Sequence, residues 1–171
     1  MGLFKMGKKN EKGFTLVELL VVIAIIGILA AVIAPNVFAQ IERGKISAVV
    51  SEYRAVKTAA ILVDSDGKSI TDDQGLTLVN DLLEKKMFGT GATEAPFGGN
   101  YKIVNNFLIV PDVPVKAGNS IAKTIANLDK PGFTGTNENA DVRWVSNTTT
   151  NADAIAEPTG EAATLAIRLI Q

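Results

Sequence analysis

The sequence predicts an α+β protein in which a long amino-terminal α-helix packs, by its carboxy-terminal half, on a small antiparallel β-sheet. Three patterns support this prediction: a long apolar run, helical spacing of apolar residues directly after it, and short strand-like runs in the second half of the chain. They divide the 171 residues into a leader (1–13), an apolar helix (14–34), its amphipathic continuation (35–63) and a globular head (64–171) that packs on residues 35–63.

The composition argues against several classes of protein. The net charge is −1, so the chain lacks the basic excess of a general nucleic-acid binder, and no specific nucleic-acid site is evident. The chain has no cysteine and no histidine, which removes disulfides, thiolate nucleophiles and the commonest general base and metal ligand. We therefore expect no cofactor and no enzymatic activity, with an anchored surface enzyme or binding module as the alternative from another class.

The apolar run has the length of a membrane span. Residues 14–34 would form a helix about 32 Å long, close to the ~30 Å hydrocarbon core of a bilayer. The preceding leader, residues 1–13, carries four lysines and one glutamate, hence a charge of +3. The positive-inside rule then places the leader in the cytoplasm and the rest of the chain outside.

Three interpretations of this segment compete, and Glu18 distinguishes them. A secretory signal peptide would be cut after its apolar region, whereas a plain signal anchor would stay uncut and would leave a carboxylate within the membrane unexplained. In the third interpretation the cut falls before the apolar run, after Gly13, and creates a new amine on Phe14. Because Phe14 and Glu18 are four residues apart, they share one helix face and can pair within a chain or between neighbouring chains.

The residues around the proposed cut resemble the cleavage motif of type IV prepilins. The resemblance covers roughly residues 8–45, includes the apolar run up to Pro35, and is closer to the IVa branch than to the IVb branch. The motif reads Lys12-Gly13-Phe14-Thr15-Leu16-Val17-Glu18-Leu19-Leu20-Val21-Val22.

The resemblance implies a pilin fold and a life cycle. It implies cleavage after Gly13 by a prepilin peptidase, which also N-methylates Phe14, and it places Glu18 at the family's acidic docking position. The precursor would sit in the cytoplasmic membrane as a single-pass protein and then polymerise with itself into an extracellular filament, with an assembly platform and minor pilins as further partners. A pseudopilin of a type II secretion system shares this amino terminus and is the alternative. The disulfide that often closes the last loop in the family is absent, because the chain has no cysteine.

Helical patterning continues beyond the apolar run. Pro35 either ends the helix or bends it; we predict a bend that matters for assembly, because apolar residues recur at spacings of three and four immediately afterwards. Gly44 is a point of weaker helix. The predicted packing face comprises Val37, Phe38, Ile41, Ala48, Val49, Tyr53, Val56, Ala59, Ala60 and Val63.

The head is predicted to contain two further helices and three or four strands. The pair Asn105-Asn106 tolerates positive φ and indicates a hairpin turn, whereas Pro111 and Pro114 are expected to end the strand that follows. The predicted order is a helix over residues 75–86 capped within residues 71–74, a connector over 87–99, strands over 101–104 and 107–110, a helix over 121–128, a strand over 141–145, an exposed loop over 146–161 and a strand over 163–170.

Two groups of carboxylates are candidate calcium sites. Oxygen-rich loops can hold calcium, but the spacing of the first group does not fit an EF-hand loop and the second group is dispersed. We therefore predict solvated loops and a helix cap rather than metal sites. The first group is Asp64, Asp66, Asp72 and Asp73, and the second is Glu138, Asp141 and Asp153.

Overall fold

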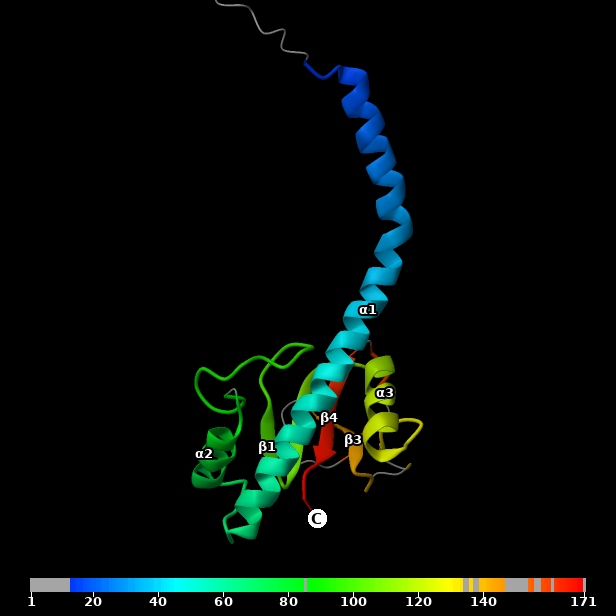
Figure 1. The fold of residues 1–171 in the computed structure, drawn as a ribbon. Coiled ribbons are helices and arrows are strands. Elements are labelled where there is room, and N and C mark those ends of the chain that lie inside the picture. Colours follow the sequence, from blue (N-terminus) through cyan, green and yellow to red (C-terminus); the bar gives the residue numbers. More distant parts are fainter. Residues whose placement is uncertain are drawn as a thin grey trace, which may run out of the picture. The chain divides into compact units, whose positions relative to one another are not determined.

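The computed structural model describes residues 13–84, 86–133, 136, 139–146, 154–155, 158–160 and 162–170. Within these residues it contains three helices and four strands (Figure 1). The chain separates into two compact units, residues 1–40 and residues 41–171. Most of the predicted leader, together with Glu138, Asp153 and most of the predicted loop over residues 146–161, lies outside the described residues.

Helix α1 (Leu16–Ser65) is the long amino-terminal helix that the sequence predicts. It passes through Pro35 without ending, so the interpretation of this proline as a helix terminus is wrong. Proline has no N–H group, so the carbonyl of Ala31 loses its usual intrahelical donor at this point. The residues on both sides keep the helical conformation, so α1 runs on to Ser65.

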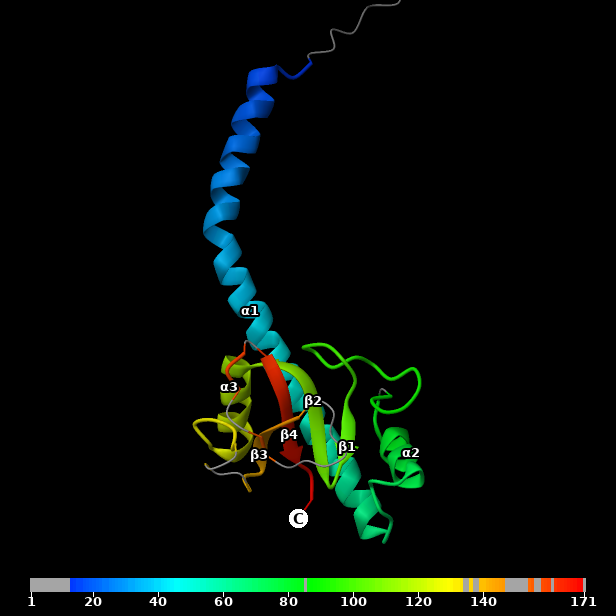
Figure 2. The ribbon, with the colours of Figure 1, turned by 180° about the vertical axis from the view of Figure 1, so that it is seen from behind.

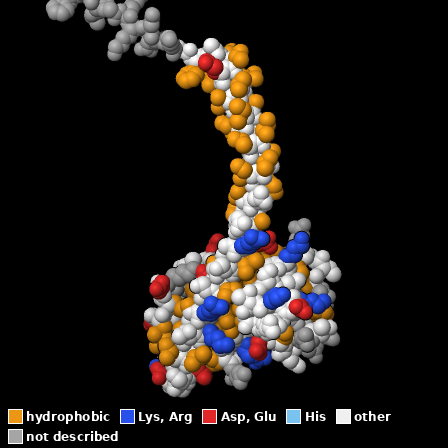
Figure 3. Space-filling view, turned by 45° about the vertical axis from the view of Figure 1, so that its right-hand side comes forward, with side chains coloured by type: hydrophobic (Ala, Val, Ile, Leu, Met, Phe, Trp, Pro, Cys, Tyr) orange, Lys and Arg blue, Asp and Glu red, His pale blue; other side chains and the backbone are white. Residues whose placement is uncertain are grey.

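The described part of the first unit, residues 13–40, has no buried core. All of its described residues, 13–40, are exposed. The most apolar window of α1 has a mean hydropathy of 3.1 and no buried part, which makes this helix long and apolar enough to cross a membrane. Figure 3 shows hydrophobic side chains along this part of the helix.

The second unit contains one antiparallel sheet of four strands in the order β1-β2-β4-β3 (Figures 1 and 2). Asn105 and Asn106 form the predicted turn between β1 and β2, with φ values of 48° and 65°. The last strand in the sequence, β4, is therefore paired on both sides. The strands are β1 (Lys102–Val104), β2 (Phe107–Pro114), β3 (Val142–Val145) and β4 (Ala162–Arg168).

Strand β2 is longer than predicted, because Pro111 does not end it. The register of β2 against β4 shifts between Val110 and Val113, which marks a β-bulge. Asp112 lies in this bulge with a φ of 55°. A bulge takes residues out of the regular ladder, so the missing N–H of Pro111 costs no ladder hydrogen bond.

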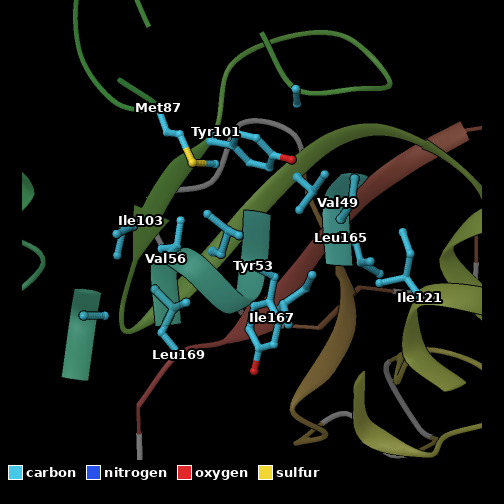
Figure 4. Packing of buried hydrophobic residues seen from close by; sticks show 14 of the residues in the cluster. Val49, Tyr53, Val56, Met87, Tyr101, Ile103, Ile121, Leu165, Ile167 and Leu169 are labelled. Atoms are coloured by element: carbon cyan, nitrogen blue, oxygen red, sulfur yellow. The ribbon is translucent and has the colours of Figure 1, made fainter. Parts of the chain in front are cut away.

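The core of the second unit lies between α1 and one face of the sheet. Val49, Tyr53 and Val56 of α1 pack in one cluster with Leu165 and Ile167 of β4 (Figure 4). The opposite face of the sheet buries a smaller cluster formed by Phe107, Ile109, Val145 and Ala166. Because both faces are covered, β3 reads as a continuous run of buried residues instead of an alternating one.

The packed face of α1 starts later than the sequence pattern predicts. Val37, Phe38 and Ile41 are exposed, with 46%, 71% and 50% of their surface accessible. The first fully buried residue of the helix is Val49, three residues after the partly buried Ile46. The predicted packing face is therefore confirmed from Ala48 onwards, whereas its first three residues, Val37, Phe38 and Ile41, are not packed.

Helix α2 (Asp73–Leu82) begins two residues earlier than predicted and ends four residues earlier. The carboxylate of Asp72 accepts a hydrogen bond of 2.6 Å from the Gly75 amide, so this acidic residue is the helix N-cap. Leu82, the last residue of the helix, is 54% exposed. It faces outward because the helix ends there and the chain turns back towards Met87 and Phe88.

Helix α3 (Val115–Ala126) begins six residues before its predicted start. It follows directly after Pro114 at the end of β2, and it ends at Asn127, which adopts the left-handed conformation with a φ of 54°. Gly118 of this helix packs against the indole ring of Trp144 on β3. In both ribbon views α2 lies beside β1 and α3 beside β3, so the two helices flank opposite edges of the sheet (Figures 1 and 2).

Asn80 organises the segment after α2, and its removal is expected to destabilise the second unit. Its side-chain oxygen accepts hydrogen bonds from the amides of Met87 and Phe88, and its amide group donates to the Phe88 carbonyl at 2.8 Å. Asn80→Ala leaves these three backbone groups without their partner, so we expect a loss of about 2–3 kcal/mol in the free energy of unfolding. Urea unfolding followed by tryptophan fluorescence measures this loss.

The matched control is Asn119→Ala in α3, another half-buried asparagine on a helix. A surface substitution of this kind is expected to change stability by no more than about 0.5 kcal/mol. Equal losses for Asn80→Ala and Asn119→Ala would show that the hydrogen bonds of Asn80 contribute nothing specific.

Tyr101 is expected to make stability depend on alkaline pH. Its buried hydroxyl donates a hydrogen bond to the carboxylate of Glu52 on α1. Burial raises the pKa of Tyr101 above its ordinary value of 10.0, and the hydrogen bond and negative charge of Glu52 raise it further. The folded state thus favours the protonated phenol, and this contribution is complete below pH about 10 and is lost as the pH rises above that value.

We expect the free energy of unfolding to fall by about 1.4 kcal/mol per pH unit above pH 10 from this group alone. Lysines titrate in the same range, so the useful quantity is the difference between the unmodified protein and Tyr101→Phe, measured by urea unfolding at about pH 9 and about pH 11. The same decline in both proteins would contradict the role given to Tyr101.

Candidate functional site

The amino terminus of α1 is capped by Thr15 and Glu18, because the side chain of each residue accepts a hydrogen bond from the backbone amide of the other. The Thr15 amide and hydroxyl donate to the Oε2 atom of Glu18 at 2.7 and 2.9 Å, and the Glu18 amide donates to the Thr15 hydroxyl at 3.2 Å. This arrangement is a capping box, with Thr15 as the N-cap residue and Glu18 at the third helical position. It satisfies two amide groups that have no partner inside the helix.

The predicted cleavage position lies immediately before this capping box. Gly13 and Phe14 are both exposed, and Phe14 has 84% of its surface accessible. A Cβ atom added to Gly13 would meet no other atom within 4 Å, so the peptide bond after it is open to an approaching protein. Helix α1 starts only at Leu16, so this bond lies outside the helix.

Glu18 is well placed to accept an amine. Its negative charge lies in the first turn of α1, where the positive end of the helix dipole stabilises it. A carboxylate has about four acceptor positions on its two oxygens, and both bonds from Thr15 end on Oε2. The group therefore has acceptor capacity left for an ammonium group.

Sequence reasoning identified Glu18 but missed the partner that the structure gives it. The structure brings Glu18 together with Thr15 in the first turn, and it places Pro35 much farther along the same helix. The spacing of Thr15 and Glu18 is the S/T-x-x-E pattern that signals a capping box, so the information was present in the sequence. The sequence interpretation related Glu18 to the membrane and to the amine of Phe14, and not to the backbone of Thr15.

One acidic residue of the first candidate metal group, Asp72, has a structural role. Asp72 caps α2, and Asp64 lies in the last turn of α1. Among the residues that the structure describes, no three acidic side chains form a cluster suited to a metal ion. The second group is only partly within the described residues, and there Asp141 forms an ion pair of 2.6 Å with Arg168.

Comparisons with known proteins identify the same segment. The family model of the prokaryotic N-terminal methylation motif matches residues 8–34, which contain Gly13, Phe14 and Glu18. A fimbrial protein of Pseudomonas aeruginosa is 48% identical over 62 residues, covering 36% of this chain and 40% of that protein. The type IV major fimbrial protein FimA of Dichelobacter nodosus is 46% identical over 65 residues, covering 38% of this chain and 42% of that protein.

A longer match reaches beyond the amino-terminal helix. Type II secretion system core protein G of Klebsiella michiganensis is 30% identical over 113 residues, covering 58% of this chain and 78% of that protein. By contrast, the chain spans only about two fifths of the length of the fimbrial proteins it matches. No solved structure matches the chain.

The methylation motif, the exposed apolar helix and the four-stranded α+β head together define a pilin-like protein with an amino-terminal membrane-length helix. Since core protein G is matched over most of its length and the fimbrial proteins match the helix closely, the chain belongs to the type IV pilin family.

Proposed function

We propose that this protein is the structural subunit of a type IV pilus. The observation that carries the proposal is the methylation motif over residues 8–34, which coincides with an exposed apolar helix of membrane length. Two of the similar proteins are fimbrial proteins by name, which supports the same role. The protein acts by assembling and not by catalysing a reaction.

The proposed sequence of events begins in the cytoplasmic membrane. The precursor inserts as a single-pass protein, with the leader inside and the head outside. A prepilin peptidase cuts after Gly13 and methylates the new amine of Phe14. The exposed position of Gly13 and Phe14 supports this step, because the scissile bond is accessible before the helix begins.

Assembly then moves the apolar helix from lipid into the filament. Residues 13–40 are exposed in the single chain, and apolar surface of this extent requires either lipid or other copies of the helix. An assembly platform and minor pilins would start and guide the polymer. The amine of Phe14 in one subunit would pair with Glu18 of its neighbour, and Pro35 would adjust the helix to the curvature of the filament.

A pseudopilin of a type II secretion system is the second candidate. It is favoured by the match to core protein G, which covers 78% of that protein and extends into the head. The two candidates share processing and helical assembly. They differ in whether the polymer leaves the cell surface as a long filament or stays within the envelope.

The intact mass of protein sheared from the cell surface tests the proposal. We expect the mass of residues 14–171 plus one methyl group, in abundant filaments. The uncut mass, or a chain beginning near Pro35, would overturn the proposed processing. The processed mass confined to the membrane fraction would favour the pseudopilin.

A further inference from the structure

Three large apolar side chains of α1 are exposed between the predicted membrane span and the first buried residue of the helix. They form an apolar ridge that consists of Val37, Phe38 and Ile41, which share a helix face and are 46–71% exposed. They follow the predicted membrane span, which ends at residue 34, and they precede Val49, the first fully buried residue. Large apolar side chains that remain exposed together in this way mark a contact surface.

A groove of about 760 Å³ lies on the second unit between α1 and the end of α2. Small side chains of α1 line its floor, so another helix can approach closely there. Leu62 and Leu82 at its sides are 51% and 54% exposed. We call it the α1–α2 groove, and its described lining comprises Ala48, Ser51, Glu52, Ala55, Thr58, Ala59, Leu62, Leu82, Leu83, Glu84 and Met87.

The groove is long enough to take the ridge, and charged residues of opposite sign lie beside the two surfaces. The groove floor extends from Ala48 to Leu62, about 21 Å along the helix, whereas the ridge occupies about one helical turn. The described lining of the groove includes Glu52 and Glu84 and no basic side chain. The ridge is followed within two residues by Arg43, which is exposed.

We propose that the ridge of one subunit inserts into the α1–α2 groove of a second copy of this chain, with Arg43 facing Glu84. This inference rests on the proposed filament function and names the contact between neighbouring subunits. The ridge and the groove are different surfaces of the same chain, and in a filament we infer that they meet head to tail, which leaves one ridge and one groove free at the two ends of the oligomer. Such a contact propagates into a helical polymer, which a self-complementary contact does not.

Pairs of introduced cysteines test this contact in filaments of the full chain. The sequence has no cysteine, so only introduced thiols can form disulfides. Phe38→Cys combined with Leu82→Cys in one chain is expected to give a ladder of disulfide-linked multimers on a non-reducing gel. Each single variant should stay monomeric, and filaments containing both single variants should give dimers.

The matched control combines Phe38→Cys with Lys116→Cys, an exposed position on α3 outside the groove. We expect no ladder from this pair. A ladder from the control together with none from the Leu82→Cys pair, in filaments of normal abundance, would overturn the groove contact while leaving the pilus function intact.

A charge exchange provides a second measurement that does not alter the apolar contact. Arg43→Glu is expected to lower the yield of sheared filaments about fivefold, because it places like charges together at the edge of the groove. Adding Glu84→Arg should restore the yield. If chains with Phe38→Cys do not assemble, the charge exchange alone tests the groove contact. Failure of Glu84→Arg to restore the filament yield of Arg43→Glu would then overturn the inference.

The failure of the proposed function gives a different result. In that case the unmodified chain would yield no polymer at all, and its mass would show no cut after Gly13. Filaments that form normally but give neither crosslink nor charge rescue would speak against the groove alone.

Discussion

Replacing Gly118 with alanine is expected to lower the free energy of unfolding of the head by about 2 kcal/mol. A Cβ atom at this position would lie 2.2 Å from Cη2 and 2.6 Å from Cζ2 of Trp144. Trp144 is 1% exposed, so its rigid ring is held by the core and cannot move aside. Overpacking of this kind costs ~1–3 kcal/mol, which exceeds the gain of up to ~1 kcal/mol that alanine brings to a helix.

Trp144 is the only tryptophan in the sequence, so its fluorescence reports unfolding at the site of the change. The matched control is Gly44→Ala in α1, where an added Cβ would meet nothing within 4 Å. This substitution should stabilise the protein by up to about 1 kcal/mol. A Gly118→Ala protein with an unfolding midpoint equal to that of Gly44→Ala would show that the ring accommodates the extra methyl group.

Replacing Glu18 with glutamine is expected to abolish filament formation without preventing capping of α1. Glutamine also serves in a capping box, so the bonds to Thr15 are retained while the negative charge is lost. If Glu18 pairs with the amine of Phe14 in a neighbouring subunit, removing one partner of that buried charge pair costs ~2–5 kcal/mol. This corresponds to a loss of about 30-fold or more in subunit affinity.

The complementary control is Thr15→Ala, which removes the partner of Glu18 in the capping box but keeps the carboxylate. It should cost ~1 kcal/mol of helix stability and leave most of the filament yield. Immunoblots of sheared filaments against total subunit measure both variants. If Thr15→Ala abolishes filaments and Glu18→Gln does not, Glu18 acts as a helix cap and the docking hypothesis is wrong.

The long helix and the hairpin were predictable because local patterns determine them. Apolar spacing of three and four defines α1, and two consecutive asparagines suit the two positive φ values of the β1–β2 turn. The choice of packing face on α1 was also predictable from Ala48 onwards. The residue at which packing begins was not predictable, because periodicity shows which face of a helix is apolar but not how much of that face is buried.

The errors in the head come from residues whose role depends on tertiary structure. Pro111 normally ends a strand, and only the bulge at Asp112 lets β2 continue through it. The first turn of α3 contains no strong sequence signal apart from Pro114, and its packing depends on the space that Gly118 leaves for Trp144. The S/T-x-x-E spacing identifies Thr15 as a helix cap. This role was missed because Glu18 had already been assigned to the amine of Phe14.

The central position of β4 has a consequence for the order of events during synthesis. β4 is the last strand along the chain, and it is the one that joins β3 to β2. Under the proposed membrane insertion, the sheet cannot close until residues 162–168 have emerged from the translocation channel, after α1 has entered the membrane. Chains halted before residue 162 should accordingly remain sensitive to protease on the outer side of the membrane, so anchoring comes first and the head acquires its shape only at the end of export.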